Sequence, residues 1–162
     1  MIRKAPERAS PRVEIARFQL RHLKRILEIE QAAFPEEPYD REIFLDLYQE
    51  CPELFLIAKI SRRIAGYIAV SMHSKKAEVI SIGVEPARRR QGAASALLSY
   101  ALAWLKARGC RQVELMVRKD NEPALRFYRN FGFRRIGEAP RYYKGGHTGI
   151  KMRRKLAAGR FM

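Results

Sequence analysis

The stretch that decides the fold is ISIGVEPARRRQGAASALL, which runs from Ile80 to Leu98. Its alternating apolar residues predict a strand that ends before Pro86, and the small residues from Gly92 onward predict the start of a helix. A helix start offers about four unpaired N–H groups and roughly half a positive charge, which an anion reaches only where side chains are small. The three arginines at 88–90 can add charge-assisted contacts. The stretch therefore favours a phosphate cradle; a basic patch for nucleic acid and plain helix packing are the alternatives.

The sequence before this stretch predicts two helices and the first strands of a sheet. Alternation in VEIARF predicts the first strand, and five residues then recur at helical spacing until Pro35. Those five are Leu23, Ile26, Leu27, Glu30 and Phe34. Three apolar, β-branched runs with short polar links predict an antiparallel meander. The expected elements are strands at 13–18, 54–60, 64–73 and 76–84, and helices at 23–34 and 41–50.

The sequence after it predicts two further helices and three strands. Gly109 stops the long helix, and Pro123 lies in the first turn of the next, where a missing N–H costs nothing. The expected elements are helices at 92–108 and 122–131 and strands at 111–118, 133–140 and 148–156. The order βααβββαβαββ predicts one α/β (α+β) domain, with a mixed, mostly antiparallel seven-stranded sheet and helices on both faces. We expect this domain to span 13–156, between tails at 1–12 and 157–162.

The composition restricts the class of protein. Its 162 residues are 47% hydrophobic, which is enough for the core of one domain. Lys and Arg number 33 against 17 Asp and Glu, and the formal charge of +16 predicts an anionic ligand or partner. Cys51 and Cys110 lack zinc-ligand spacing, so we expect free thiols, no metal and a cytoplasmic protein. No apolar window is long enough to predict a membrane span.

A second stretch, NEPALRFYRNFGF from Asn121 to Phe133, follows the next strand. Together with the R-x-x-G-x-A pattern at 89–94, it resembles the GNAT superfamily of acetyl-CoA-dependent N-acetyltransferases. The segments IGVEPARRRQGAASALL, VELMVRKDNEPALRFYRNFGF and RYYKGGHTGIKM are most similar to the RimI/Ard1 type, which acetylates protein N-terminal α-amines. The resemblance implies an acyltransferase that takes its acetyl group from acetyl-CoA.

The resemblance also implies roles along the cofactor. The main chain of 82–84 would pair with the pantetheine arm, the loop and helix start would hold the pyrophosphate, and the Asn121 amide would hold the arm. Tyr128 would be the general acid that protonates the departing thiolate; the alternative is an aromatic core residue. The cofactor-binding residues so implied are Ile82, Gly83, Val84, Arg89, Arg90, Gln91, Gly92, Ala93, Ala94, Ser95, Asn121 and Tyr128.

The proton acceptor is where this sequence departs from the family pattern. RimI-like enzymes have a glutamate directly before Val117, where this chain has Met116, whose thioether cannot take a proton. Alternation puts Glu114 on the same strand face, about 6.8 Å away. Glu114 is a candidate base acting through a water, or a solvated charge paired with Arg118. Glu36, in the loop FPEEPYD, matches a family loop glutamate and is the other candidate; ordinary solvation is its alternative.

A missing base matters less for some amines than for others. A protein α-amine is about 10% neutral at pH 7, whereas a lysine side chain is roughly 0.04% neutral. Freeing the amine therefore costs on the order of 1.4 kcal/mol in the first case and 4.6 kcal/mol in the second. The methionine at the family's base position thus favours α-amines as acceptors.

The segment RYYKGGHTG supplies the expected acceptor contacts. In the family, tyrosines at this bend line the slot for the first residues of the peptide, so Tyr39, Tyr142 and Tyr143 are the candidates; a hairpin with packed aromatic rings is the alternative. We expect direct attack of the amine, because Cys51 and Cys110 lie outside the motifs. Two other functions stay open: acetylation of a small amine or lysine side chain, and a basic RNA- or ribosome-binding module with little catalysis.

Overall fold

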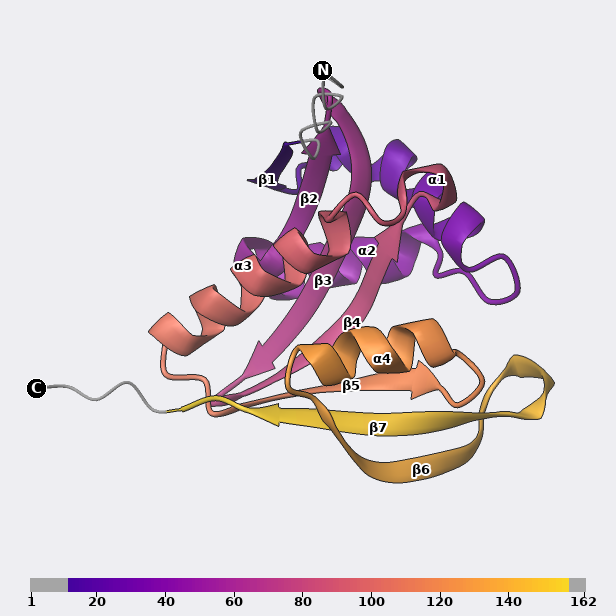
Figure 1. Ribbon diagram of the computed structural model, residues 1–162. Coiled ribbons are helices and arrows are strands. Elements are labelled where there is room, and N and C mark those ends of the chain that lie inside the picture. Colours follow the sequence, from indigo (N-terminus) through magenta and orange to yellow (C-terminus); the bar gives the residue numbers. More distant parts are fainter. Residues whose placement is uncertain (1–11, 158–162) are drawn as a thin grey trace, which may run out of the picture.

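One seven-stranded sheet runs through the molecule in the order β1-β2-β3-β4-β5-β7-β6 (Figure 1). The computed structural model describes residues 12–157. The strands are β1 (Val13–Arg17), β2 (Phe55–Ile60), β3 (Arg63–His73), β4 (Lys76–Val84), β5 (Gln112–Arg118), β6 (Arg134–Tyr143) and β7 (His147–Lys155). Every neighbouring pair is antiparallel except β4 and β5. The predicted mixed, mostly antiparallel sheet is therefore confirmed.

Helices cover both faces of this sheet, as the element order predicts. On one face lie α1 (Leu23–Ala33) and α2 (Arg41–Glu50), and on the other lie α3 (Ala93–Ala107) and α4 (Glu122–Asn130) (Figure 1). Each pair of helices encloses its own buried cluster. Adjacent residues of β2 face different clusters, Leu56 toward α3 and Ile57 toward α1 and α2. This explains why β2 is a continuous apolar run rather than an alternating one.

The element boundaries agree closely with the sequence prediction. All expected helices and strands begin and end within one residue of their predicted limits, except that β6 continues to Tyr143. The expected tails at 1–12 and 157–162 lie outside the described residues, apart from Arg12 and Ala157. No helix within the described residues is both long and apolar enough to cross a membrane.

The parallel pair β4–β5 is joined over only three residues of each strand. Lys76–Glu78 pair with Gln112–Glu114, and the described residues contain no further pairing between these strands. Beyond this point the two strands separate (Figure 1). The other edge of β4 stays paired with β3, and the other edge of β5 stays paired with β7. Main-chain groups are therefore left unpaired on the edges that β4 and β5 turn toward each other.

A bulge in β4 changes the direction of its side chains at the same level. Val79 and Ser81 pair with consecutive residues of β3, so Ile80 is an extra residue in the strand. Val79 packs in the cluster under α3, whereas Ser81 and Gly83 face Tyr67, in the cluster under α1 and α2. The bulge thus directs a hydroxyl group toward the α1 side where the strands part.

Close packing of β3 against β4 makes Gly66 a sensitive position. A Cβ on Gly66 would lie 2.8 Å from the main-chain oxygen of Gly83, so β4 would have to move. We expect Gly66→Ala to lower the free energy of unfolding by about 1–3 kcal/mol. Gly137→Ala is the matched strand control, because its Cβ would meet no atom within 4 Å. Urea unfolding of both variants checks this, and equal losses would contradict it.

Candidate functional site

The residues expected to bind an extended ligand lie where β4 leaves β5. Ile82, Gly83 and Val84 follow the last residue of β4 that pairs with β5, Glu78. A strand edge with free N–H and C=O groups accepts an extended chain as an added strand. The gap therefore has the hydrogen-bonding capacity that a ligand with amide groups requires.

The start of α3 forms an anion-accepting end of this gap. Gly92 is the N-cap residue, with φ of 90° and no side chain to bond the first-turn N–H groups. Arg90 also has a left-handed φ, of 64°. A Cβ placed on Gly92 would meet no atom within 4 Å, so the space before the helix is open. The N–H groups of Ala93, Ala94 and Ser95 are thus available to a phosphate.

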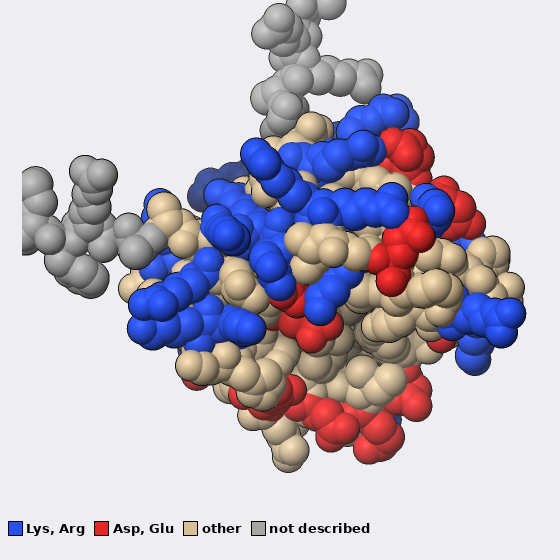
Figure 2. Space-filling model, turned by 90° about the horizontal axis from the view of Figure 1, so that it is seen from below, with Lys and Arg blue, Asp and Glu red and all other residues tan. Residues whose placement is uncertain are grey.

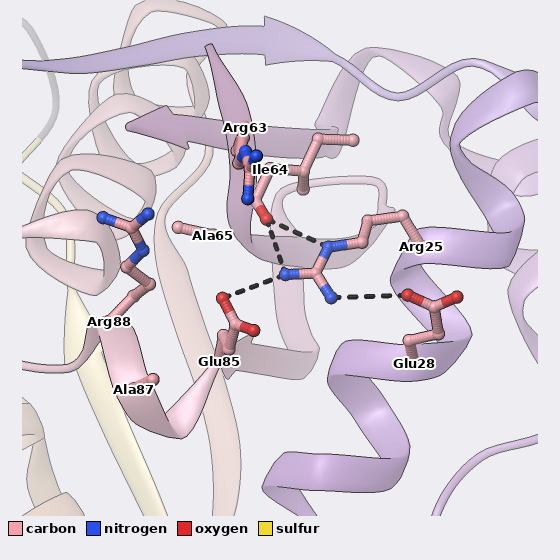
Figure 3. Close-up of a pocket in the computed structure, with 8 residues that line it drawn as sticks. All are labelled: Arg25, Glu28, Arg63, Ile64, Ala65, Glu85, Ala87 and Arg88. Atoms are coloured by element: carbon pink, nitrogen blue, oxygen red, sulfur yellow. Dashed lines mark hydrogen bonds and ion pairs between the residues drawn. The ribbon is translucent and has the colours of Figure 1, made fainter. Parts of the chain in front are cut away.

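Arg25 of α1 holds the chain from which the α3 loop departs (Figure 3). Its Nε and Nη2 donate to the main-chain oxygen of Ile64 at 3.2 and 3.1 Å, and Nη2 lies 2.9 Å from Oε2 of Glu85. These groups border a hollow of about 510 Å³, which Arg88 also lines. Arg88 therefore belongs to the α1 side of the loop, whereas Arg89 and Arg90 are exposed beyond it.

Across the gap, α4 presents Asn121 and Tyr128. Asn121 caps α4, because its Oδ1 accepts the N–H of Ala124 at 3.2 Å, and this leaves its amide donors available. Tyr128 is 7% exposed and packs edge-on against Phe133. Its hydroxyl bonds to no group in 12–157 and is not a buried unsatisfied atom, so it reaches accessible space. Burial, with the nearby Tyr143, raises the pKa of Tyr128, which keeps it protonated as a donor must be.

Three tyrosines meet on the other side of the sheet, between the α1–α2 loop and the β6–β7 hairpin. The rings of Tyr142 and Tyr143 are 4.9 Å apart. The Lys144 N–H donates to Oε2 of Glu37 at 3.1 Å, which joins hairpin to loop. Burial raises the pKa of Tyr39 and of Tyr143, and Tyr142 adds to both shifts. The predicted acceptor contacts Tyr39, Tyr142 and Tyr143 are therefore brought together by the fold.

The two carboxylates expected as bases are both held by cations. Oε2 of Glu36 lies 2.7 Å from Nη1 of Arg118. Glu114 is bound by Arg153 at 2.6 Å and by Lys151 at 3.2 Å. Burial acts to raise the pKa of Glu114, but the hydrogen bonds from Arg153 and Lys151 outweigh it and lower the pKa. The expected pairing of Glu114 with Arg118 is wrong, because Arg118 bonds Glu36 and Asp120 instead.

Met116 lies over β7, beside the tyrosines. A Cβ on Gly149 would fall 2.6 Å from Cε of Met116 and 3.2 Å from Cβ of Tyr142. The glycine therefore provides the space in which these two side chains lie. An apolar wall stands where the family pattern has a carboxylate.

The sequence prediction missed a buried polar cluster of Glu30, Tyr67 and Ser81. Glu30 is 2% exposed, and its carboxylate accepts the Tyr39 N–H at 3.0 Å and the Tyr67 hydroxyl. The Tyr67 hydroxyl also lies 2.8 Å from Oγ of Ser81. Burial raises the pKa of Glu30, although the hydrogen bonds from Tyr39, Tyr67 and Ser81 oppose the rise. The sequence contained one signal for this cluster: Glu30 is a charged residue at a position of the apolar helical pattern before Pro35.

Part of the positive charge of the chain lies on β6 and β7. Figure 2 shows Lys and Arg gathered on the side of the molecule where β6 and β7 lie. Exposed basic residues on these strands include Arg134, Arg135, Lys151 and Lys155. Arg134 pairs with Arg153, whereas Tyr143 pairs with His147 beside the turn. The basic residues at 134, 135 and 155 therefore lie at the end of the β6–β7 hairpin away from the tyrosine group.

Comparison with known proteins shows which family this chain belongs to and which proteins it is similar to. The profile of the Acetyltransferase (GNAT) family matches residues 23–133. An uncharacterized N-acetyltransferase of Methanocaldococcus jannaschii is 33% identical over 142 residues, which cover 87% of this chain and 90% of the relative. An N-alpha-acetyltransferase of Sulfurisphaera tokodaii is 28% identical over 151 residues, which cover 85% of this chain and 90% of the relative.

A solved structure agrees over nearly the whole described fold. Ard1 from Thermoplasma volcanium superposes with a TM-score of 0.85 at 29% identity, and the match covers 90% of this chain and 98% of Ard1. The element order, the helices on both faces and the family resemblance predicted from the sequence are therefore confirmed.

Substitution of Glu30 should change how stability depends on pH. A carboxyl group whose pKa is raised on folding binds more protons in the native state, so it lowers stability as pH rises above about 4.5, its ordinary value. Gln stays neutral and keeps an acceptor for the Tyr39 N–H. The quantity to follow is the free energy of unfolding of the wild type minus that of Glu30→Gln. We expect this difference to decrease as the pH rises from about 4.5 to above the raised pKa of Glu30. Urea unfolding between pH 4 and pH 8 measures it; a pH-independent difference would contradict the burial effect.

Proposed function

This chain belongs to the Acetyltransferase (GNAT) family, and on that basis we propose that it transfers the acetyl group of acetyl-CoA to the α-amine of a protein N-terminus. GNAT acetyltransferases use acetyl-CoA, and this chain is an N-acetyltransferase of that family. The observation that carries the proposal is the gap between β4 and β5, with an anion-accepting helix start at one end and a tyrosine slot on the opposite face.

In this proposal acetyl-CoA lies in the gap. The edge of β4 at 82–84 bonds the amides of the pantetheine arm, and the Asn121 amide holds the arm from the α4 side. The first-turn N–H groups of α3 bond the pyrophosphate. Arg89, Arg90 and Gln91 assist from the loop. The bound thioester supplies an activated acetyl group, and the residues of the chain only need to orient it and move protons.

The reaction proposed is direct attack of a neutral amine on the thioester carbon. The carbon–nitrogen bond forms, the carbon–sulfur bond breaks, and the thiolate takes a proton from Tyr128. The raised pKa of Tyr128 supports this role, because the hydroxyl is protonated at neutral pH. Tyr128 stands on the α4 side and the tyrosine slot on the α1 side, so amine and leaving group occupy opposite faces of the sheet.

The acceptor slot supports an N-terminal peptide rather than a long free side chain. Tyr39, Tyr142 and Tyr143 form it, together with the apolar Met116. No carboxylate free of a cation partner lies on its β5 wall within the described part of the chain. An α-amine releases its proton at lower cost than a lysine does. The name of the Sulfurisphaera tokodaii relative, an N-alpha-acetyltransferase, agrees with this acceptor.

The positive surface on β6 and β7 supports an anionic partner. We propose that a ribosome or other RNA is that partner and that Arg134, Arg135, Lys151 and Lys155 meet it, which would bring the enzyme to emerging N-termini. RNA affinity that is insensitive to salt concentration would remove this proposal, because phosphate contacts release counterions. The free thiols of Cys51 and Cys110 support a cytoplasmic location.

Mass spectrometry after incubation with acetyl-CoA tests the acceptor. We expect acetylation of unblocked peptide N-termini, with polyamines and free lysine acetylated more slowly. Turnover of a polyamine or of lysine above that of every peptide would favour the small-amine or lysine acetyltransferase instead.

Tyr128→Phe should lower kcat about a hundredfold with little change in acetyl-CoA affinity, because a general acid contributes about 10²–10⁴ in rate. Unchanged turnover would remove Tyr128 from its role.

Calorimetric titration with acetyl-CoA tests the phosphate end of the gap. Gly92→Val strains a left-handed residue and places a side chain in the open space before α3. Arg88→Ala removes a guanidinium that lines the hollow on the α1 side. We expect Gly92→Val to raise Kd about tenfold or more, about 1.4 kcal/mol, and Arg88→Ala to raise it less. Equal losses would contradict the helix-start cradle and favour a generic basic patch.

A further inference from the structure

The buried cluster of Glu30, Tyr67 and Ser81 lies on the α1 side of the sheet and reaches β4 just past its last pairing with β5. We propose that Glu30 is the proton acceptor of the reaction and acts through Tyr67 and Ser81. In this proposal Glu30 does not touch the substrate: Ser81 contacts the amine, and Glu30 receives the proton through Tyr67. This inference rests on the proposed acetyl transfer, but it does not depend on which primary amine is the acceptor.

The cluster forms an unbroken chain of hydrogen bonds across three elements. The carboxylate of Glu30, near the end of α1, accepts the hydroxyl of Tyr67 on β3. The same hydroxyl lies 2.8 Å from Oγ of Ser81 on β4. Tyr67 has no exposed surface, whereas Ser81 is 9% exposed. Ser81 is therefore the end of the chain that a substrate reaches.

The β4 bulge places that end beside the gap between β4 and β5. Ser81 follows the extra residue Ile80 and lies past Glu78, the last β4 residue that pairs with β5. Its side chain faces the α1 side of the sheet, where the tyrosine slot lies. The other oxygen of Glu30 accepts the Tyr39 N–H at 3.0 Å, so the same carboxylate fixes the loop that carries part of the slot.

Glu30 also differs in its charge environment from Glu36 and Glu114, the two carboxylates predicted as bases. Glu36 and Glu114 are each paired with cations, which hold them as carboxylates with little tendency to take a proton. Glu30 forms no ion pair with Lys, Arg or His among residues 12–157. Its neighbours are hydroxyl groups and one main-chain N–H. Burial raises its pKa toward the range in which a general base works best.

The proton transfers balance without a further reactant. As the nitrogen bonds to the acetyl carbon, it releases a proton to Oγ of Ser81. Ser81 passes its own proton to the Tyr67 oxygen, and Tyr67 passes its proton to the Glu30 carboxylate. The thiolate is protonated separately by Tyr128. Exchange with water later removes the proton from Glu30 and restores the one that Tyr128 has lost.

The pH dependence of the reaction follows from the groups that face the cluster. Tyr67 on β3 and Tyr39 in the loop are its titratable neighbours. Glu37 and Glu78 face Tyr39 and raise the pKa of that tyrosine. Below the pKa of Glu30, both the amine and the carboxylate must lose a proton before reaction. The logarithm of kcat/KM for the amine should then rise with a slope of about two, and with a slope of about one above that pKa.

The test compares Glu30→Gln with Glu42→Gln, a matched change at an exposed position of α2. We expect Glu30→Gln to lower kcat/KM for the best amine about a hundredfold, to reduce the acid slope to about one, and to leave the Kd of acetyl-CoA unchanged. Glu42→Gln should behave as the wild type. Met116→Glu in the Glu30→Gln background should restore at least a tenth of the wild-type rate, because it returns a carboxylate to the β5 wall.

The outcomes separate a proton acceptor from a structural residue. Wild-type kcat/KM and slope in Glu30→Gln would overturn the proposal. A loss that keeps the slope of two, or one that Met116→Glu does not relieve, would assign Glu30 a structural role and equally overturn it. If the wild type acetylates small amines but no peptide, the proposed acceptor fails, and the same comparison with the best small amine still decides the role of Glu30.

Discussion

β4 and β5 pair over Lys76–Glu78 and Gln112–Glu114 only, and the position of every group in the site follows from where that pairing stops. Parallel strands need a long crossover, and α3 supplies it from one end of β4 to the start of β5. The start of that crossover helix therefore lies at the diverging ends of the strands. The first-turn N–H groups of α3 and the unpaired edges of β4 and β5 therefore lie close together. The main chain alone brings them together, and no side chain has to be aligned.

The parts of this arrangement that the sequence predicts are those written in local patterns. Gly92 and the small residues after it predict an open helix start, and the strand and helix limits follow from periodicity. The register of β4 against β5 and the bulge at Ile80 depend on partners distant in sequence, so no local pattern specifies them. Glu30 shows the same limit: its helical spacing predicts burial correctly, but its partners Tyr67 and Ser81 come from strands 37 and 51 residues away in the chain.

The distribution of charge explains why Glu30 differs from Glu36 and Glu114. Basic side chains outnumber acidic ones almost two to one, so an acidic group at the surface of the β5–β7 region finds a cation within reach, as Glu114 and Glu36 do. Glu30 is buried between α1 and the sheet, and this keeps its carboxylate away from the cations. The hydroxyl groups of Tyr67 and Ser81 satisfy the carboxylate without neutralising it, which is costly for stability but leaves its proton affinity high.

The uncapped start of α3 has a consequence for the free protein. The starts of α2 and α4 are capped by the side chains of Asp40 and Asn121. The N-cap of α3 is Gly92, which forgoes that side-chain hydrogen bond at a cost of only about a few tenths of a kcal/mol. A ligand phosphate that occupies this end restores the missing partner and binds only the folded chain. At a ligand concentration a hundred times Kd the linkage adds about 2.7 kcal/mol. Acetyl-CoA held at this end would therefore couple the folded population of this protein to the supply of its acetyl donor.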